Sequence, residues 1–195
     1  QYVTVMEVGG AYAHLFFDLL KFLELRSLII TDLDAVETPG GKACAVHLGT
    51  YSSNACLKAW FSEDDPFTLA GLLAKKDAGK VLKRNRIAYQ RAEKEGDPCG
   101  RTFEDAFILA NPKLFGLTEK TPQGLELEAR SKAEEWKKSE FALKHAIAET
   151  EWVAPAYIVD GVRWLARGDV VAPDPALALA VEAAVPPVEG GVGHA

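Results

Sequence analysis

The feature that most constrains the fold is an apolar segment, residues 26–32, whose end carries the acidic pair Asp32 and Asp34. Its Leu-Ile-Ile run predicts a short buried β-strand. A second apolar run at 2–8 predicts another strand, and residues 11–25 between them predict an amphipathic helix. A strand, a helix and a strand within about thirty residues predict a βαβ unit with a parallel sheet. We therefore expect an α/β fold.

Active sites of parallel sheets lie beyond the carboxyl ends of the strands. Asp32 and Asp34 fall there, and so does Glu7 at the end of the first predicted strand. Strand alternation predicts that Asp32 and Asp34 share one face, where two close carboxylates repel unless a cation lies between them. Such oxygen ligands suit Mg²⁺ or Mn²⁺. The alternative interpretation is a turn or helix cap with solvated carboxylates.

Two further candidates lie downstream. Thr102 is placed to cap a helix that ends near Asn111, and Glu104 and Asp105 occupy its first turn. One of these acids is expected to favour the helix dipole, and the other is a candidate metal ligand. Lys138 lies one helical turn after an acidic residue, so spacing alone predicts a surface ion pair.

The net charge of -6 argues against sequence-independent binding of nucleic acid by the whole surface. One segment differs, because residues 75–94 contain eight Lys or Arg and two acidic residues. Its functional interpretation is a track for a phosphate backbone, and its structural interpretation is a solvated face. The candidate DNA-binding residues are Lys75, Lys76, Lys80, Lys83, Arg84 and Arg86.

The 195 residues suffice for one domain with an apolar core. We expect this domain to cover 1–168, with a helical insertion at about 54–95 in which 86–90 is extended. C-terminal helices are expected at about 125–166, as a long polar helix to 150 and a shorter one from 156. Residues 169–195, rich in Pro, Ala and Gly, predict a flexible tail.

The three cysteines cannot all pair within the chain, which favours a reducing compartment and predicts a cytoplasmic protein. No run of about 18 apolar residues occurs, so we expect no membrane-spanning helix. The first residue is Gln1, within a predicted strand, and we expect the chain to be part of a longer protein.

Three segments carry a resemblance to a known family. Residues 7–36 (EVGGAYAHLFFDLLKFLELRSLIITDLDAV) resemble the Toprim domain of nucleases of the OLD (overcoming lysogenization defect) family. GRTFEDAFILANP at 100–112 and KKSEFALKHAIAETEWVAPAYIVDGVRWLA at 137–166 resemble later blocks of that family, in its class 2 branch. The resemblance implies a Toprim-like (Rossmann-like) parallel sheet flanked by helices.

The resemblance also implies a two-metal DNA endonuclease that uses Mg²⁺ or Mn²⁺, with Ca²⁺ as an inhibitor. Asp32 and Asp34 match the family's metal ligands, and Glu104 matches its downstream acid, with Asp105 as a rival. Lys138 matches a lysine that supports the phosphate or the transition state. The family's other catalytic glutamates are expected before Gln1.

The implied partners are DNA, an N-terminal ATPase domain of the same protein through which it forms homo-oligomers, and a helicase-like protein. The implied setting is anti-phage defence or DNA repair. Two alternatives stay open. The sequence IITDLD also resembles the nucleophile strand of haloacid-dehalogenase-like phosphatases, with Asp32 as nucleophile, although Ala35 and the residues after it depart from that pattern. The second alternative is a non-catalytic Toprim module that is used for assembly.

Overall fold

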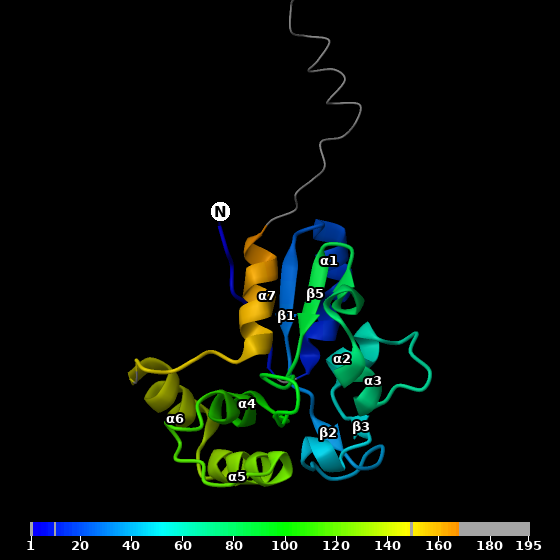
Figure 1. Ribbon diagram of the computed structural model, residues 1–195. Helices are drawn as coiled ribbons and strands as arrows, with labels where there is room; N and C mark the ends of the chain where they lie inside the picture. Colours follow the sequence, from blue (N-terminus) through cyan, green and yellow to red (C-terminus); the bar gives the residue numbers. More distant parts are fainter. Residues whose placement is uncertain (1, 10, 149, 168–195) are drawn as a thin grey trace, which may run out of the picture.

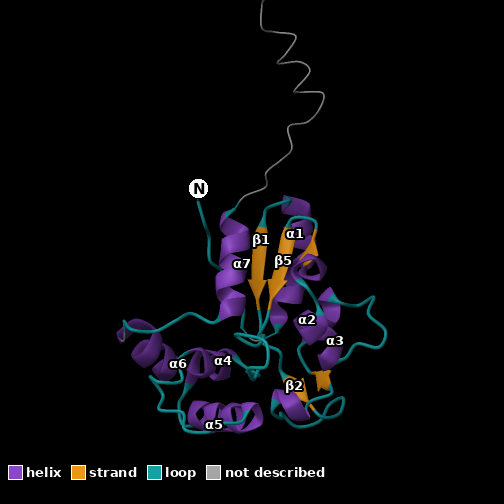
Figure 2. Cartoon of the chain, in the orientation of Figure 1, coloured by secondary structure: helices purple, strands orange, loops and turns teal. Residues whose placement is uncertain are grey.

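The computed structural model describes residues 2–9, 11–148 and 150–167, and this part of the chain is a mixed α/β structure (Figure 1, Figure 2). Its helices are α1 (Phe17–Leu23), α2 (Ala55–Trp60), α3 (Leu69–Ala74), α4 (Phe103–Ala110), α5 (Pro122–Glu134), α6 (Lys138–Phe141), the π-helix η4 (Ala142–Ala148) and α7 (Ala156–Ala166). Its strands are β1 (Ser27–Ile30), β2 (Ala35–Val36), β3 (Tyr51–Ser52), β4 (Val81–Leu82) and β5 (Asn85–Ala88). Three 3-10 helices, η1 (Tyr12–Phe16), η2 (Val46–Leu48) and η3 (Asp77–Lys80), complete the described elements.

The main sheet has the strand order β1-β5-β4. β1 and β5 run parallel, with Ile29 opposite Ile87 and Ile30 opposite Ala88. Both strands point toward the part of the chain that contains α4 and α5 (Figure 2). β4 pairs antiparallel with β5, and β2 and β3 form a separate antiparallel pair. The carboxyl ends of the two parallel strands therefore meet at one edge.

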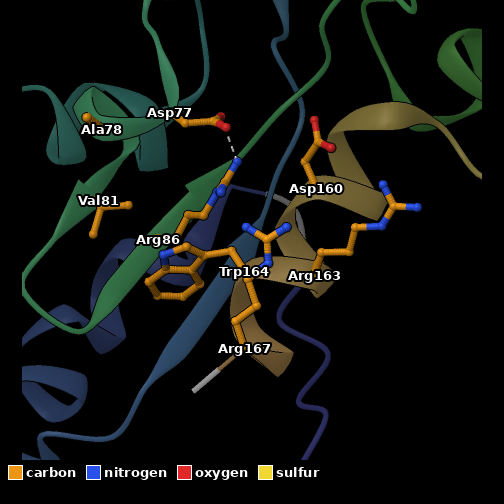
Figure 3. A pocket seen from close by; sticks show the side chains of 8 residues that line it. All are labelled: Asp77, Ala78, Val81, Arg86, Asp160, Arg163, Trp164 and Arg167. Carbon is orange, nitrogen blue, oxygen red and sulfur yellow. Dashed lines mark hydrogen bonds and ion pairs between the residues drawn. The ribbon is translucent and has the colours of Figure 1, made fainter. Parts of the chain in front are cut away.

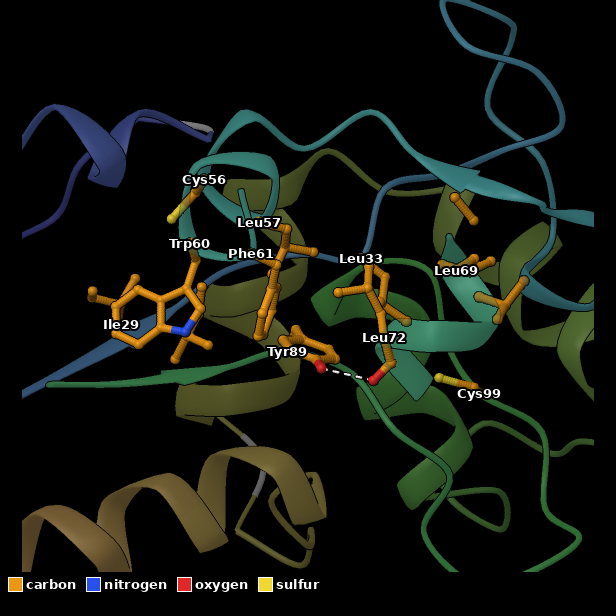
Figure 4. Close-up of a cluster of buried hydrophobic side chains, with 13 residues drawn as sticks. Ile29, Leu33, Cys56, Leu57, Trp60, Phe61, Leu69, Leu72, Tyr89 and Cys99 are labelled. Carbon is orange, nitrogen blue, oxygen red and sulfur yellow. Dashed lines mark hydrogen bonds between the residues drawn. The ribbon is translucent and has the colours of Figure 1, made fainter. Parts of the chain in front are cut away.

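One face of the sheet is covered by α2 and α3 through a cluster of buried side chains (Figure 4). Ile29 and Ile87 contribute from the strands, and Trp60 and Leu72 contribute from the helices. Tyr89 follows β5, and its hydroxyl donates a hydrogen bond of 2.7 Å to the carbonyl oxygen of Leu72. Burial of each large apolar side chain contributes about 1.5–3 kcal/mol, which fixes these helices against the strands.

The other face of the sheet is covered by α7, which packs closely against the strands. Gly161 of α7 is buried, and a Cβ atom there would lie 2.9 Å from Leu28 Cδ1 and 3.4 Å from Ala88 Cβ. A glycine is required for this close approach of helix to strands. Tyr157, one turn earlier on α7, is buried beside Ala88 and Ala106. The amino-terminal part of α7 is therefore held next to the carboxyl end of β5.

α4 begins and ends where its sequence predicts. The Thr102 hydroxyl accepts a hydrogen bond from the backbone N–H of Asp105, and the Asp105 carboxylate accepts one from the N–H of Thr102, which forms a capping box. Phe107 in the middle of the helix is 1% exposed and packs against Phe141 and other aromatic rings. The cap and the aromatic cluster together set the position of the first turn of α4.

The predicted strand at 2–8 is wrong. These residues form no strand, and Tyr2 and Val5 are 104% and 90% exposed. The parallel partner of β1 is β5, so the predicted βαβ unit at 2–32 is not formed. An apolar, β-branched run satisfies the local pattern of a strand, but pairing is decided by distant residues that the pattern does not specify.

Two other expectations, the insertion at 54–95 and the long helix at 125–150, differ in part from the structure. The expected insertion at 54–95 contains α2 and α3, and the extended piece expected at 86–90 corresponds to β5, which belongs to the main sheet. The long helix expected at 125–150 is broken into α5, α6 and η4. The break lets Trp136 and His145 pack edge to face, with ring centroids 5.1 Å apart.

The shorter C-terminal helix is confirmed as α7. The predicted tail at 169–195 lies outside the described residues. Among the helices that the structure describes, none combines the length and the apolar character that crossing a membrane requires.

The three cysteines are free thiols that differ in exposure, and we predict that they differ in reactivity. Cys56 and Cys99 are 0% and 8% exposed, and burial raises the pKa of Cys56 to about 11 and that of Cys99 further. Burial also raises the pKa of Cys44, but this thiol is only half-buried and is therefore more accessible to a reagent. Because the thiolate is the reactive form, a disulfide reagent should modify one thiol per folded chain rapidly and all three in urea. Rapid modification of all three in the folded chain would contradict this packing.

Candidate active site

The carboxyl ends of β1 and β5 are joined by the side chain of Gln90, which is fully buried. Its Nε2 donates a hydrogen bond of 2.6 Å to Asp32 Oδ1, and its Oε1 accepts one of 2.7 Å from the backbone N–H of Leu33. A parallel pair of strands brings these residues to the same edge although they are far apart in sequence. Gln90 therefore fixes the orientation of Asp32.

Asp34 is held by different neighbours. Its backbone φ is +49°, in the left-handed region, so the chain is not extended here and the predicted alternation of Asp32 and Asp34 does not apply. Asp34 Oδ1 lies 3.0 Å from Arg101 Nη2, and Asp34 Oδ2 accepts a hydrogen bond of 3.0 Å from Asn54 Nδ2. The Arg101 guanidinium thus compensates the negative charge of the Asp34 carboxylate at this edge.

The two neighbouring acids of α4 have separate roles. Asp105 accepts hydrogen bonds from the backbone N–H groups of Arg101 and Thr102. Burial raises the pKa of Asp105, and these backbone hydrogen bonds oppose the rise. Glu104 is 9% exposed, and its carboxylate makes no hydrogen bond or ion pair with the residues that the structure describes. Asp105 belongs to the capping box with Thr102, and Glu104 does not.

Tyr157 connects the acids on β1 and α4. It is 3% exposed, and its hydroxyl accepts a hydrogen bond of 3.4 Å from Gln90 Nε2. Burial raises the pKa of the Tyr157 hydroxyl, and the negative charges of Asp32 and Glu104 raise it further. Tyr157 therefore links Gln90, which binds Asp32, to Ala106 of α4, the helix that carries Glu104.

The carboxylates of Asp32 and Glu104 have the chemical character of ligands for a hard divalent cation. Asp32 and Glu104 offer carboxylate oxygens, which are ligands that Mg²⁺ and Mn²⁺ prefer. In residues 2–9, 11–148 and 150–167, no group of three or more His, Cys, Asp or Glu is arranged to hold a metal ion. Asp34 is directed to Arg101 instead of to a shared centre with Asp32 and Glu104.

The remaining predicted site residues lie elsewhere. Lys138 is the first residue of α6, and its side chain lies outside the described part of the structure. Glu7 is exposed in the N-terminal segment that forms no strand. Neither is placed at the carboxylate edge by a described contact. Gln90, Arg101 and Tyr157, which complete the edge, were not candidates on sequence, because their contacts join residues far apart in the chain.

The predicted basic track does not form one continuous surface. Lys75 pairs with Asp64 at 2.8 Å, and the buried Lys80 ammonium lies 4.4 Å from the centre of the Tyr89 ring. Burial is the main cause that lowers the pKa of Lys80. Arg86 is buried on β5, whereas three of the predicted residues are exposed: Lys76, Lys83 and Arg84. The exposed charges are thus those near η3 and the β4–β5 turn.

Comparison with known proteins gives a similarity to endonuclease GajA of Bacillus cereus (strain HuB5-5). The two sequences are 32% identical over 118 residues, which cover 57% of this chain and 16% of GajA. The chain thus corresponds to a small part of the length of that protein. No family model matches the chain, and no solved structure matches it.

Proposed function

We propose that this chain is the catalytic part of a DNA endonuclease, and that its active site is the carboxylate edge formed by Asp32, Asp34 and Glu104. The observation that carries the proposal is the hydrogen bond that holds Asp32 beside Gln90 at the carboxyl ends of the parallel strands, with Tyr157 linking Gln90 to α4, the helix that carries Glu104. The distant similarity to endonuclease GajA supports the same activity.

The reaction proposed is hydrolysis of a phosphodiester, in which water forms a bond to phosphorus and one P–O bond of the backbone breaks. A bound Mg²⁺ or Mn²⁺ would supply an activated water and stabilise the charge that develops on the phosphate. Asp32 and Glu104 would hold the cation, and Asp34 would join them only after its carboxylate leaves Arg101. Gln90 keeps Asp32 in place through its hydrogen bond of 2.6 Å, and Lys138 is proposed to stabilise the negative charge of the phosphate.

Arg101 has a positioning role in this proposal. It pairs with Asp34 through its guanidinium, and its backbone N–H donates to the Asp105 cap of α4. Because it contacts both the loop after β1 and the start of α4, it couples the position of Asp34 to that of Glu104. A cation at this edge would compete with Arg101 for Asp34.

The finer features rest on the family resemblance. They are a Toprim-like domain of the OLD family, two divalent ions, an ATPase domain elsewhere in a longer protein, a helicase-like partner, and a cytoplasmic role in anti-phage defence. The short match to GajA agrees with a chain that forms part of a longer nuclease. DNA is the expected substrate.

The experiment that tests the proposal compares two substrates. The chain is incubated with supercoiled plasmid and with p-nitrophenyl phosphate, each with Mg²⁺, with Mn²⁺ and with EDTA. We expect nicked plasmid in the presence of metal and none in EDTA, with no release of nitrophenol. Nitrophenol release without nicking would replace the nuclease by a phosphatase with Asp32 as nucleophile, and no reaction with either substrate would contradict catalysis by this chain.

A further inference from the structure

A second candidate site lies between β5, η3 and the carboxyl-terminal half of α7 (Figure 3). It is a pocket of about 380 Å³, and its walls include Arg86, Arg163, Trp164 and Arg167. A helix rises about 1.5 Å per residue, so Arg163 and Arg167 lie roughly 9 and 15 Å along α7 from Tyr157. The pocket is therefore separate from the carboxylate edge.

The charge of Arg86 is only partly compensated. Its side chain is 7% exposed, and Nη2 lies 2.8 Å from Oδ1 of Asp77, whose own side chain is 72% exposed. The Nε atom of Arg86 is buried, and within the described part of the chain it has no hydrogen-bond partner. A buried guanidinium is costly unless its charge and donors are matched. Arg86 thus favours an anion at this place.

Two further arginines add positive charge to the same pocket. Arg163 lies on α7, and Arg167 is the C-cap residue four positions later with helical backbone angles, so both lie on one side of the helix. Neither side chain forms an ion pair or hydrogen bond among the described residues. The acid nearest in sequence, Asp160, is already paired with Arg91 at 2.6 Å. The pocket therefore has more positive charge than its own acids neutralise.

The apolar wall of the pocket is fixed in place. Arg26 Cζ lies 3.8 Å from the centre of the Trp164 ring, and Arg26 Nη2 donates a hydrogen bond of 2.7 Å to the Trp164 carbonyl oxygen. The indole is held by these contacts, so this wall of the pocket is fixed in place. Figure 3 shows the indole and Arg86 among the side chains that line the pocket.

We propose that this pocket binds a phosphate group. Guanidinium groups bind phosphate oxygens with strong, charge-assisted hydrogen bonds, and several of them around one cavity suit an anion with several oxygens. A volume of about 380 Å³ also admits the organic group attached to the phosphate. The ligand is either a small phosphate compound or a nucleic-acid backbone that reaches the pocket.

The test uses the whole chain in EDTA, so that it is independent of cleavage. Binding of inorganic phosphate is measured by calorimetry for the wild type and for the double variant Arg163→Gln/Arg167→Gln. The matched control is Lys113→Gln/Lys120→Gln, which removes the same charge from exposed residues elsewhere. Loss of charged hydrogen bonds should weaken phosphate binding about tenfold or more in the double variant and not in the control.

A second arm identifies the source of the phosphate. Binding of a short DNA duplex is measured over a range of salt concentrations. If the ligand is nucleic acid, the double variant binds the duplex more weakly and with a salt slope reduced by about 2. If the ligand is a small phosphate compound, the duplex binds the variant and the wild type equally. Absence of phosphate binding by the wild type, or equal binding by wild type and double variant, would overturn the proposal.

Discussion

Glu104→Gln is expected to weaken the binding of Mn²⁺ by at least about a hundredfold, because even residues that only support metal ligands contribute 10–100-fold to metal affinity. The substituted glutamine would keep the shape of the side chain and remove its charge. Glu104 makes no hydrogen bond or ion pair with the described residues, so the fold loses no contact of that kind. Binding is measured by electron paramagnetic resonance of free Mn²⁺.

Thermal unfolding provides a second measurement on the same variant. At a Mn²⁺ concentration a hundred times the dissociation constant, the wild type should gain about 2.7 kcal/mol of stability, and Glu104→Gln should gain much less. The matched control is Glu134→Gln, at an exposed carboxylate that pairs with Arg130 on α5. Equal Mn²⁺ affinity of Glu104→Gln and the wild type would remove Glu104 from the proposed metal site.

Phe107→Ala is expected to lower the free energy of unfolding by about 3–5 kcal/mol, the usual cost of truncating a fully buried phenylalanine. Phe107 is 1% exposed, and its ring centroid lies 5.7 Å from that of Phe141 and 5.5 Å from that of Trp152. Removal of the ring leaves a cavity in the cluster that joins α4 to the C-terminal helices. The measurement is urea denaturation followed by circular dichroism.

The control for this prediction is Leu127→Ala on α5, because Leu127 is 48% exposed. An exposed leucine loses little apolar burial on truncation, so the expected effect is below about 1 kcal/mol. A Phe107→Ala variant as stable as this control would mean that the aromatic cluster does not fix α4. The position of Glu104, one turn before Phe107, would then lack its main support.

The sequence predicts the elements whose signals are local. β1 is predicted by its Leu-Ile-Ile run, and α4 by Thr102 and the apolar residues after it. The acids at the end of β1 are found in the same way, since Asp-x-Asp after a buried strand is a pattern of a few adjacent residues. For α4, the structure also separates Asp105, the cap, from Glu104, which the sequence alone could not do.

What the sequence does not predict depends on contacts between distant residues. The extended piece expected at 86–90 overlaps β5, but the sequence assigns it to a helical insertion and does not predict that it pairs with β1 in the main sheet. Gln90 and Tyr157 belong to the edge only because β5 and α7 pack beside β1. The run at 2–8 has the composition of a strand and no strand partner in the described structure.

Nicking of supercoiled plasmid by the Asp32→Asn variant tests most directly whether Asp32 and its neighbours cut DNA. Asparagine keeps an oxygen that can accept the hydrogen bond from Gln90 Nε2, so the edge should keep its structure. The control is Asp18→Asn, which alters an exposed acid on α1 away from both sites. We predict that the rate of Mn²⁺-dependent nicking falls at least about a hundredfold in Asp32→Asn and stays unchanged in the control. Nicking by Asp32→Asn at the wild-type rate would contradict the account.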